Sequence, residues 1–168
     1  MIFLSVAFLC AGVSPILSRI IVETLDADGN NNVLEDGPYG GEGGGQWSDG
    51  GEVHLNGLIN TIELRTGSEV DSIRAEYGDV WGDQHGGGGG SLHTVSLNPG
   101  AKIIMVQGRS GGRIDELEFI TDDGQVYGPY GGGGGSPFVA SHPTCWLIYF
   151  SGHAGSRLDS ITLHWECP

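Results

Sequence analysis

The stretch Gly152-His153-Ala154-Gly155-Ser156-Arg157-Leu158-Asp159-Ser160-Ile161 decides the fold, because the pattern of its last seven residues occurs three times in the chain. That pattern is a Gly, two variable residues, an aliphatic residue, an Asp, a polar residue and a second aliphatic residue, and it occupies 67–73, 111–117 and 155–161. Its aspartates are evenly spaced, since 44 residues separate Asp71 from Asp115 and Asp115 from Asp159. Self-similarity at a fixed period is the signature of a repeat architecture. The sequence therefore predicts a three-fold internal repeat.

Glycine clusters form a second series that interleaves with the first, at 40–45, 86–90 and 131–135. Two of these clusters share a longer phrase, Gly-Pro-Tyr-Gly-Gly, at 37–41 and 128–132. If the 32 glycines were scattered through the 168 residues, they would suggest a disordered or linker segment. Here they separate segments rich in Val, Ile, Leu, Phe, Tyr and Trp, so we expect one folded domain.

The segments between the turns have the patterns of β-strands. Some alternate apolar and polar residues, and others are continuous apolar runs, for which we expect cover on both faces. The alternating segments are 58–64, 73–77 and 161–165, and the continuous runs are 101–106 and 145–150. No segment shows a 3.6-residue period with caps, so we expect essentially no helix. A period of this length holds about four strands, which predicts an all-β fold of three sheets around one core.

The chain is strongly acidic, with 21 Asp and Glu against 7 Lys and Arg and a formal net charge of −14. Nucleic acids, heparin-like polymers and anionic membrane surfaces would be repelled, so they are not expected as partners. Neutral ligands and cations are compatible with this charge. An acidic balance often reflects solubility alone.

Residues 1–13 form a short apolar run that ends in small residues and has the shape of a secretory signal. The run is too short to span a bilayer. We predict a signal peptide at 1–18 with its cleavage site left open, an extension or propeptide at 19–32, and one domain at 33–168. A buried first strand is the alternative for the apolar run. No other segment is apolar enough to insert into a membrane, so we expect a secreted, extracellular protein.

The cysteines fit an oxidising compartment. Removal of the signal would take Cys10 away and leave Cys145 and Cys167 as an even pair. We predict a disulfide between these two, either within the chain or, through Cys167, between subunits.

One acidic stretch, 26–32, resembles a calcium-binding loop. Such a loop needs Gly at its sixth position and Glu at its twelfth, where this chain has Asn31 and Gly37. A polar turn is the better interpretation, and no metal ligand is assigned.

The stretch Gly37-Pro38-Tyr39-Gly40-Gly41-Glu42-Gly43-Gly44-Gly45-Gln46-Trp47-Ser48-Asp49-Gly50 resembles the N-terminal signature of jacalin-related lectins, and 152–159 resembles their carbohydrate-binding loop. The resemblance runs from about residue 33 to residue 165, with the motifs in the family's order and in three copies. It implies a β-prism of three four-stranded antiparallel sheets with internal pseudo-three-fold symmetry. It also implies reversible sugar binding, with neither catalysis nor a cofactor.

By this resemblance, the main sugar site pairs the first glycine cluster with the last Asp loop. Gly44 would present backbone to the sugar where a side chain would block it, and Gly155 would allow the tight turn of the loop. The backbone amides of Ser156 and Arg157 would donate to sugar oxygens. The carboxylate of Asp159 only accepts hydrogen bonds, which suits two neighbouring hydroxyls.

Some members of the family use additional, equivalent sites, and this chain has residues for two of them. The second would combine Gly89 and Gly90 with Ser68, Glu69 and Asp71, and the third would combine Gly134 and Gly135 with Gly112, Arg113 and Asp115. The alternative role for each Asp is a carboxylate that caps its own turn. His85 and His153 border the loops and are candidates for ligand contacts.

The resemblance also bears on specificity. Galactose-selective branches of the family are cut just before the position of Gly44, and nothing here signals such a cut, so mannose- or glucose-type glycans are expected. Several weak sites in a homo-oligomer, expected to be a dimer, would cross-link glycans and glycoproteins. Each site has one loop Asp rather than two facing carboxylates, so no enzyme is expected. The alternative function is an acidic extracellular matrix protein that binds calcium or a calcium mineral.

Overall fold

The computed structural model describes residues 33–51 and 53–168, and these form strands, turns and one short 3-10 helix. The stretches predicted as signal peptide, extension and calcium-like loop (1–18, 19–32 and 26–32) lie outside the described residues. The elements are β1 (Val33–Gly40), β2 (Gly45–Ser48), η1 (Val53–Asn56), β3 (Ile59–Thr66), β4 (Val70–Tyr77), β5 (Val80–Trp81), β6 (His85–Gly86), β7 (Ser91–Ser96), β8 (Ile103–Ser110), β9 (Ile114–Thr121), β10 (Val126–Gly131), β11 (Ser136–Ser141), β12 (Trp146–Ala154) and β13 (Leu158–Glu166).

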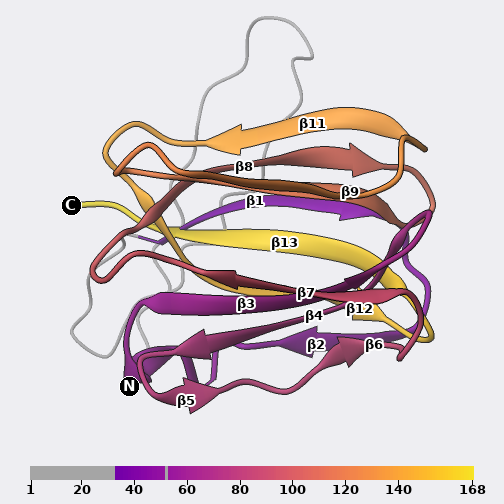
Figure 1. Ribbon diagram of the computed structural model, residues 1–168, viewed down its shortest axis with the longest axis horizontal. Coiled ribbons are helices and arrows are strands. Elements are labelled where there is room, and N and C mark those ends of the chain that lie inside the picture. Colours follow the sequence, from indigo (N-terminus) through magenta and orange to yellow (C-terminus); the bar gives the residue numbers. More distant parts are fainter. Residues whose placement is uncertain (1–32, 52) are drawn as a thin grey trace, which may run out of the picture.

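The strands form three antiparallel sheets, which Figure 1 shows from the side. One sheet has the order β1-β13-β12-β2, the second β10-β9-β8-β11, and the third β5-β4-β3-β7. The short strands β5 and β6 both pair with β4, so together they make one interrupted outer strand of the third sheet. The predicted all-β prism of three four-stranded sheets is confirmed.

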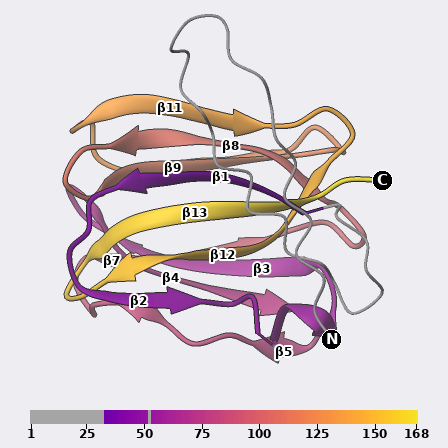
Figure 2. The ribbon, with the colours of Figure 1, turned by 180° about the vertical axis from the view of Figure 1, so that it is seen from behind.

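The two ends of the domain meet in one sheet. Strand β1 pairs with β13 from Val33 opposite Glu166 to Gly40 opposite Ser160, and the two strands lie side by side in both views (Figures 1 and 2). Strand β2 lies at the other edge of this sheet, beside β12. The connection from β1 to β2 therefore crosses the hairpin turn between β12 and β13, which brings the first glycine cluster to the last Asp loop.

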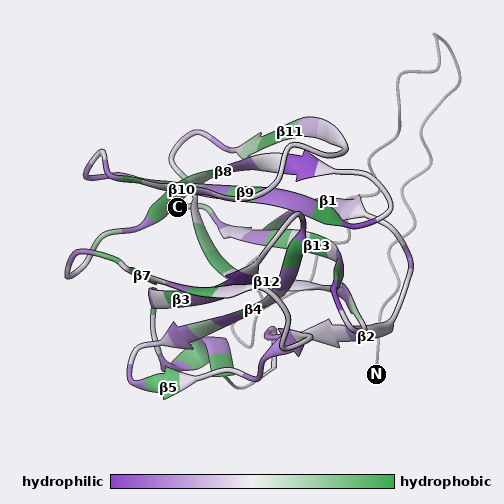
Figure 3. Ribbon diagram, turned by 45° about the vertical axis from the view of Figure 1, so that its right-hand side comes forward, coloured by the Kyte–Doolittle hydropathy of each residue, from purple (hydrophilic) through white to green (hydrophobic). Residues whose placement is uncertain are grey.

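Each repeat supplies the central hairpin of one sheet, namely β3-β4, β8-β9 and β12-β13. The Asp loop is the turn of that hairpin. The predicted alternation is present in β3 and at 73–77 of β4, and β3 and β9 share one order of buried and partly buried residues. It fails at the end of β13, where His164 is buried together with Leu163 and Trp165. Figure 3 shows hydrophobic residues interspersed with hydrophilic ones along the strands.

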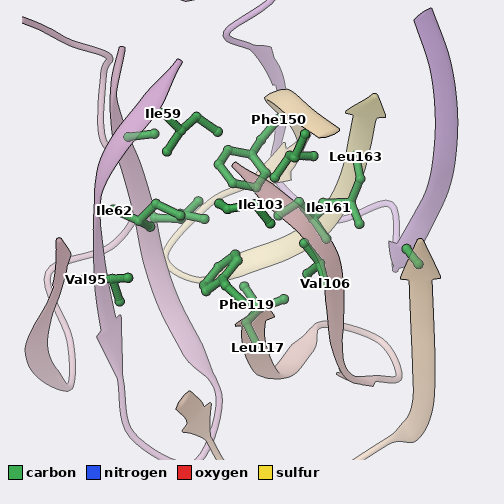
Figure 4. Packing of buried hydrophobic residues seen from close by; sticks show 14 of the residues in the cluster. Ile59, Ile62, Val95, Ile103, Val106, Leu117, Phe119, Phe150, Ile161 and Leu163 are labelled. Atoms are coloured by element: carbon green, nitrogen blue, oxygen red, sulfur yellow. The ribbon is translucent and has the colours of Figure 1, made fainter. Parts of the chain in front are cut away.

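The inner faces of the three sheets form a single core (Figure 4). Ile62, Phe119 and Phe150 come from three different sheets, and the rings of Phe119 and Phe150 meet edge to face with centroids 6.4 Å apart. The prediction that 101–106 is covered on both faces is wrong, since Ile104 is 36% exposed. In 145–150 no residue is exposed, and Trp146, Ile148 and Tyr149 are partly buried. In a prism only the inner face of each sheet packs against the other two sheets, and its outer face lies toward solvent.

Cys145 and Cys167 form a disulfide within the chain. This is the intrachain form of the predicted bridge. Because Cys145 precedes β12 and Cys167 follows β13, the bridge closes the open end of that strand pair. It therefore lies at the end of the prism opposite the turn at 155–157.

Candidate functional site

Six loops gather at one end of the prism, away from the C-terminus (the right-hand end in Figure 1). Three are the Asp loops at 67–69, 111–113 and 155–157, and three are the glycine loops at 41–44, 87–90 and 132–135. In each sheet the outer strands pair antiparallel with the central hairpin, so the glycine loop that joins them passes beside the turn of that hairpin.

The three Asp loops have the same backbone geometry. The amide of the first Gly donates to the carbonyl oxygen two residues later, and this bond is 2.9 Å at Gly67, 2.9 Å at Gly111 and 3.0 Å at Gly155. A backbone hydrogen bond therefore closes each turn. The side chains of Asp71, Asp115 and Asp159 remain directed toward the glycine loops.

The main chain of each Asp holds its glycine loop in place. The carbonyl oxygen of Asp159 accepts from the Gly41 amide at 2.9 Å, and that of Asp71 accepts from Gly87 at 2.9 Å. The third pair, Asp115 and Gly132, is 2.8 Å apart. One backbone pattern thus builds all three sites.

In the Asp159 site, the structure brings together Gly44, Gly155 and the Asp159 carboxylate, as the sequence predicts. A Cβ atom on Gly43 would lie 2.7 Å from Oδ1 of Asp159. Gly44 has φ of +65°, and a side chain there would collide with the peptide bond between Ala154 and Gly155. Position 44 therefore requires glycine, and a side chain at position 43 would displace the Asp159 carboxylate. Gly43 is not among the predicted site residues, although it aligns with the predicted Gly89 and Gly134 in the other clusters.

The other two sites repeat this geometry. Gly90 and Gly135 have φ of +61° and +56°, and a Cβ on them would lie 2.6 Å and 2.5 Å from Oδ2 of Asp71 and Asp115 respectively. A side chain on Gly89 or Gly134 would collide with Oδ1 of the same aspartates. The remaining candidates, Ser68, Glu69, Gly112 and Arg113, lie in the Asp loops.

The sites differ in how far the carboxylate is covered. Asp71 is 2% exposed and Asp159 is 9% exposed, whereas Asp115 is only half-buried. Equal spacing in the sequence therefore does not give equal access in the structure.

Two arginines outside the predicted sites hold the glycine loops. Arg109 donates from Nε to the Gly134 carbonyl at 2.7 Å and from Nη2 to the Gly135 carbonyl at 2.8 Å. Arg65 makes the equivalent bonds to Gly89 at 2.8 Å and Gly90 at 3.1 Å. The repeat period gave a signal for this role, because these arginines are 44 residues apart.

At the third position of that series stands His153, so the Asp159 site lacks the corresponding arginine. His153 lines a pocket with Gly41, Glu42 and Gln46 beside this site. His85 has a different role, since its ring stacks on Trp47 at 3.8 Å and its Nε2 lies 2.8 Å from Asp49 Oδ1. Only His153 remains a candidate for ligand contacts.

Comparisons with known proteins agree with this geometry. A family model described as Jacalin-like lectin domain matches residues 36–164. The human protein named Zymogen granule membrane protein 16 is 33% identical over 116 residues, which are 65% of this chain and 69% of that protein. The rat protein of the same name is 38% identical over 90 residues, and the match spans 53% of each protein, about half the length of that relative.

Solved structures share the fold over most of the chain. A mannose binding lectin from Champedak has a TM-score of 0.71 at 26% identity, covering 81% of this chain and 98% of its own. The artocarpin–mannotriose complex gives a TM-score of 0.72 at 26% identity, covering 82% of this chain and 99% of its own. Family model, fold and repeated loops lead to one conclusion: the chain belongs to the jacalin-like lectin domain family.

Proposed function

We propose that this protein is a lectin that reversibly binds mannose- or glucose-type glycans through its glycine and Asp loops. The observation that carries the proposal is the Asp159 site, in which a carboxylate faces bare backbone at Gly43 and Gly44. A carboxylate accepts from two hydroxyls at once, and charge-assisted hydrogen bonds are the stronger ones. The amides of Ser156 and Arg157 supply donors for the sugar oxygens.

The sugar class is supported by the solved structures. The Champedak lectin is described as mannose binding, and artocarpin has been solved with mannotriose and with methyl α-mannose.

We expect each site to be weak on its own. A monosaccharide bound with a Kd around 1 mM corresponds to about −4 kcal/mol. Several sites on one chain, and more in a dimer, raise the affinity for a glycan-coated surface through effective concentration. Cross-linking of glycoproteins follows from this multivalency.

Secretion is part of the proposal. It is supported by the intrachain disulfide, since disulfides persist in oxidising compartments. Across residues 33–51 and 53–168, the structure has no helix with the length and apolar character of a membrane span.

Calorimetric titration with methyl α-mannoside tests the proposal, with methyl α-galactoside as the matched sugar control. We expect heat from the mannoside alone. The variant Asp159→Asn keeps the side-chain volume but removes one of the two acceptor oxygens, so it should weaken binding without lowering the melting temperature. Silence with both sugars would overturn the proposed function.

The same samples test the calcium alternative, which no observation favours. Among the described residues, no group of three or more His, Cys, Asp or Glu could hold a metal ion. We expect calcium to leave the melting temperature unchanged while the mannoside raises it. A rise with calcium and none with the sugar would favour the matrix-protein function instead.

A further inference from the structure

Each site has a rim that comes from the Asp loop of another repeat. A Cβ on Gly41 would lie 2.6 Å from the Gly112 carbonyl oxygen, which places the 111–113 loop beside the Asp159 site. In the same way, Gly87 packs against Ser156 and Gly132 against Ser68. The loop 155–157 is therefore the rim of the Asp71 site, and 67–69 is the rim of the Asp115 site.

The third residue of the Asp loop is an arginine in two repeats and a glutamate in the other. It is Arg113 at the rim of the Asp159 site, Arg157 at the rim of the Asp71 site, and Glu69 at the rim of the Asp115 site. An arginine side chain is a donor that never gives up its charge under ordinary conditions. It can therefore compete with sugar hydroxyls for a loop carboxylate, whereas a glutamate cannot.

At the Asp71 site the arginine occupies the position that a ligand would need. Nη1 of Arg157 forms an ion pair with Oδ1 of Asp71, and it lies 2.8 Å from where a Gly89 Cβ would stand. Nε of the same side chain lies 3.3 Å from Oε2 of Glu69. The Asp71 side chain is 3% exposed under this cover.

The other two sites are not closed in this way. Nε of Arg113 lies 3.6 Å from Oδ1 of Asp159, beyond hydrogen-bond distance, and its Nη1 donates to Glu69 at 3.1 Å. The Asp159 side chain is 12% exposed, against 3% for Asp71. Glu69 thus turns toward the two arginines. An open pocket lined by Gly111, Gly135, Asp115 and Asp159 lies between these sites, and Asp71 does not line it.

We propose that Arg157 closes the Asp71 site, so that the resting chain binds sugar at the Asp159 and Asp115 sites only. The inference rests on the proposed function and specifies which sites operate. Opening the Asp71 site would expose a buried carboxylate to neutral hydroxyls after loss of its charged partner, which is unfavourable when the partner is a well-placed ion. The guanidinium takes the place of the sugar as the partner of the Asp71 carboxylate.

Nuclear magnetic resonance of the ¹⁵N-labelled domain reads each site separately during titration with methyl α-mannoside. In the wild-type protein we expect the amides of Gly44 and Gly134 to shift, and those of Gly89 and Gly90 to stay in place. In Arg157→Ala, the amides of Gly89 and Gly90 should shift as well, with a Kd in the range of the other sites. The substitution leaves the backbone amide of residue 157 in the Asp159 site.

Two further variants control this result. Adding Asp71→Asn to the Arg157→Ala chain should remove the new shifts, and Arg113→Ala alone should leave Gly89 and Gly90 unresponsive. Should Arg157→Ala fail to fold, Arg157→Gln keeps most of the side-chain volume without the charge and serves as the opening variant.

The outcomes separate the two proposals. Saturable shifts of Gly89 and Gly90 in the wild-type protein would overturn the closure and leave the lectin function standing. The closure is also overturned if these amides remain silent in the opening variants while Gly44 responds. If no loop amide responds in any variant, the proposed function itself is lost, and the closure with it.

Discussion

The hydroxyl of Tyr77, in the third sheet, donates a 2.7 Å hydrogen bond to Oδ2 of Asp49, which lies just beyond the edge strand of the first sheet. Tyr77 ends β4 and is fully buried, and Asp49 directly follows β2. The other oxygen of Asp49 lies 2.8 Å from Nε2 of His85 in β6. One buried carboxylate therefore joins the edge of the first sheet to the third sheet.

Replacing Tyr77 by Phe should lower the free energy of unfolding by about 1–3 kcal/mol, because a buried carboxylate loses a donor that water cannot replace. Burial and the charge of Asp49 raise the pKa of Tyr77, so the hydroxyl stays a donor throughout the ordinary pH range. Urea unfolding followed by tryptophan fluorescence measures the difference. Tyr127→Phe, in the outer strand β10, is the matched control and should change stability by less than about 0.5 kcal/mol. Equal effects of both substitutions would mean that the bond to Asp49 adds nothing.

His164 gives the fold a dependence on pH. Burial, followed by the nearby charge of His54, lowers the pKa of His164 to about 4 from its ordinary 6.5. The unfolded chain therefore binds the proton more readily, so the stabilisation is complete above pH 6.5 and is lost as the pH falls toward 4. We expect a loss of at most about 3 kcal/mol, reduced by Glu35, whose Oε1 lies 3.4 Å from Nδ1.

Urea unfolding at several pH values between 7 and 4 measures this loss. His164→Gln should flatten the curve in that window, whereas His93→Gln, in the half-buried position on β7, should leave its slope unchanged. A wild-type slope that persists in His164→Gln would assign the effect to other groups.

The sequence predicts the fold and the pairing of loops because both follow from local patterns repeated at a fixed period. The spacing of Asp71, Asp115 and Asp159 sets the hairpin turns, and the glycines beside them allow the close approach of backbone. Access to each site could not be predicted in this way. Arg157 and Asp71 lie 86 residues apart in the sequence, and only the interleaving of loops from different repeats brings them together.

Arg109 should hold the 132–135 loop, and Arg65 the 87–90 loop. Arg109→Ala removes two hydrogen bonds to loop carbonyls, each worth about 1 kcal/mol, so the amide of Gly132 should exchange with deuterium roughly tenfold faster or more. The amide of Gly87 has the same kind of bond, at 2.9 Å to Asp71, and should keep its rate. Arg65→Ala should give the reverse pattern. Faster exchange of both amides in either variant would indicate that the substitution destabilises the whole domain and not only one glycine loop.

The disulfide should support stability without taking part in sugar binding. It joins Cys145 to Cys167 across 22 positions, and a loop of this size is stabilised by about 3 kcal/mol through its effect on the unfolded chain. The double variant Cys145→Ser and Cys167→Ser should therefore unfold at lower urea concentration. The bridge lies at the end of the β12-β13 pair opposite the 155–157 turn. Under conditions in which the variant is folded, its Kd for methyl α-mannoside should therefore stay within about twofold of the wild-type value. This corresponds to a change in binding free energy below about 0.5 kcal/mol. A large loss of affinity in a variant that remains folded would show that the two ends of the prism are coupled.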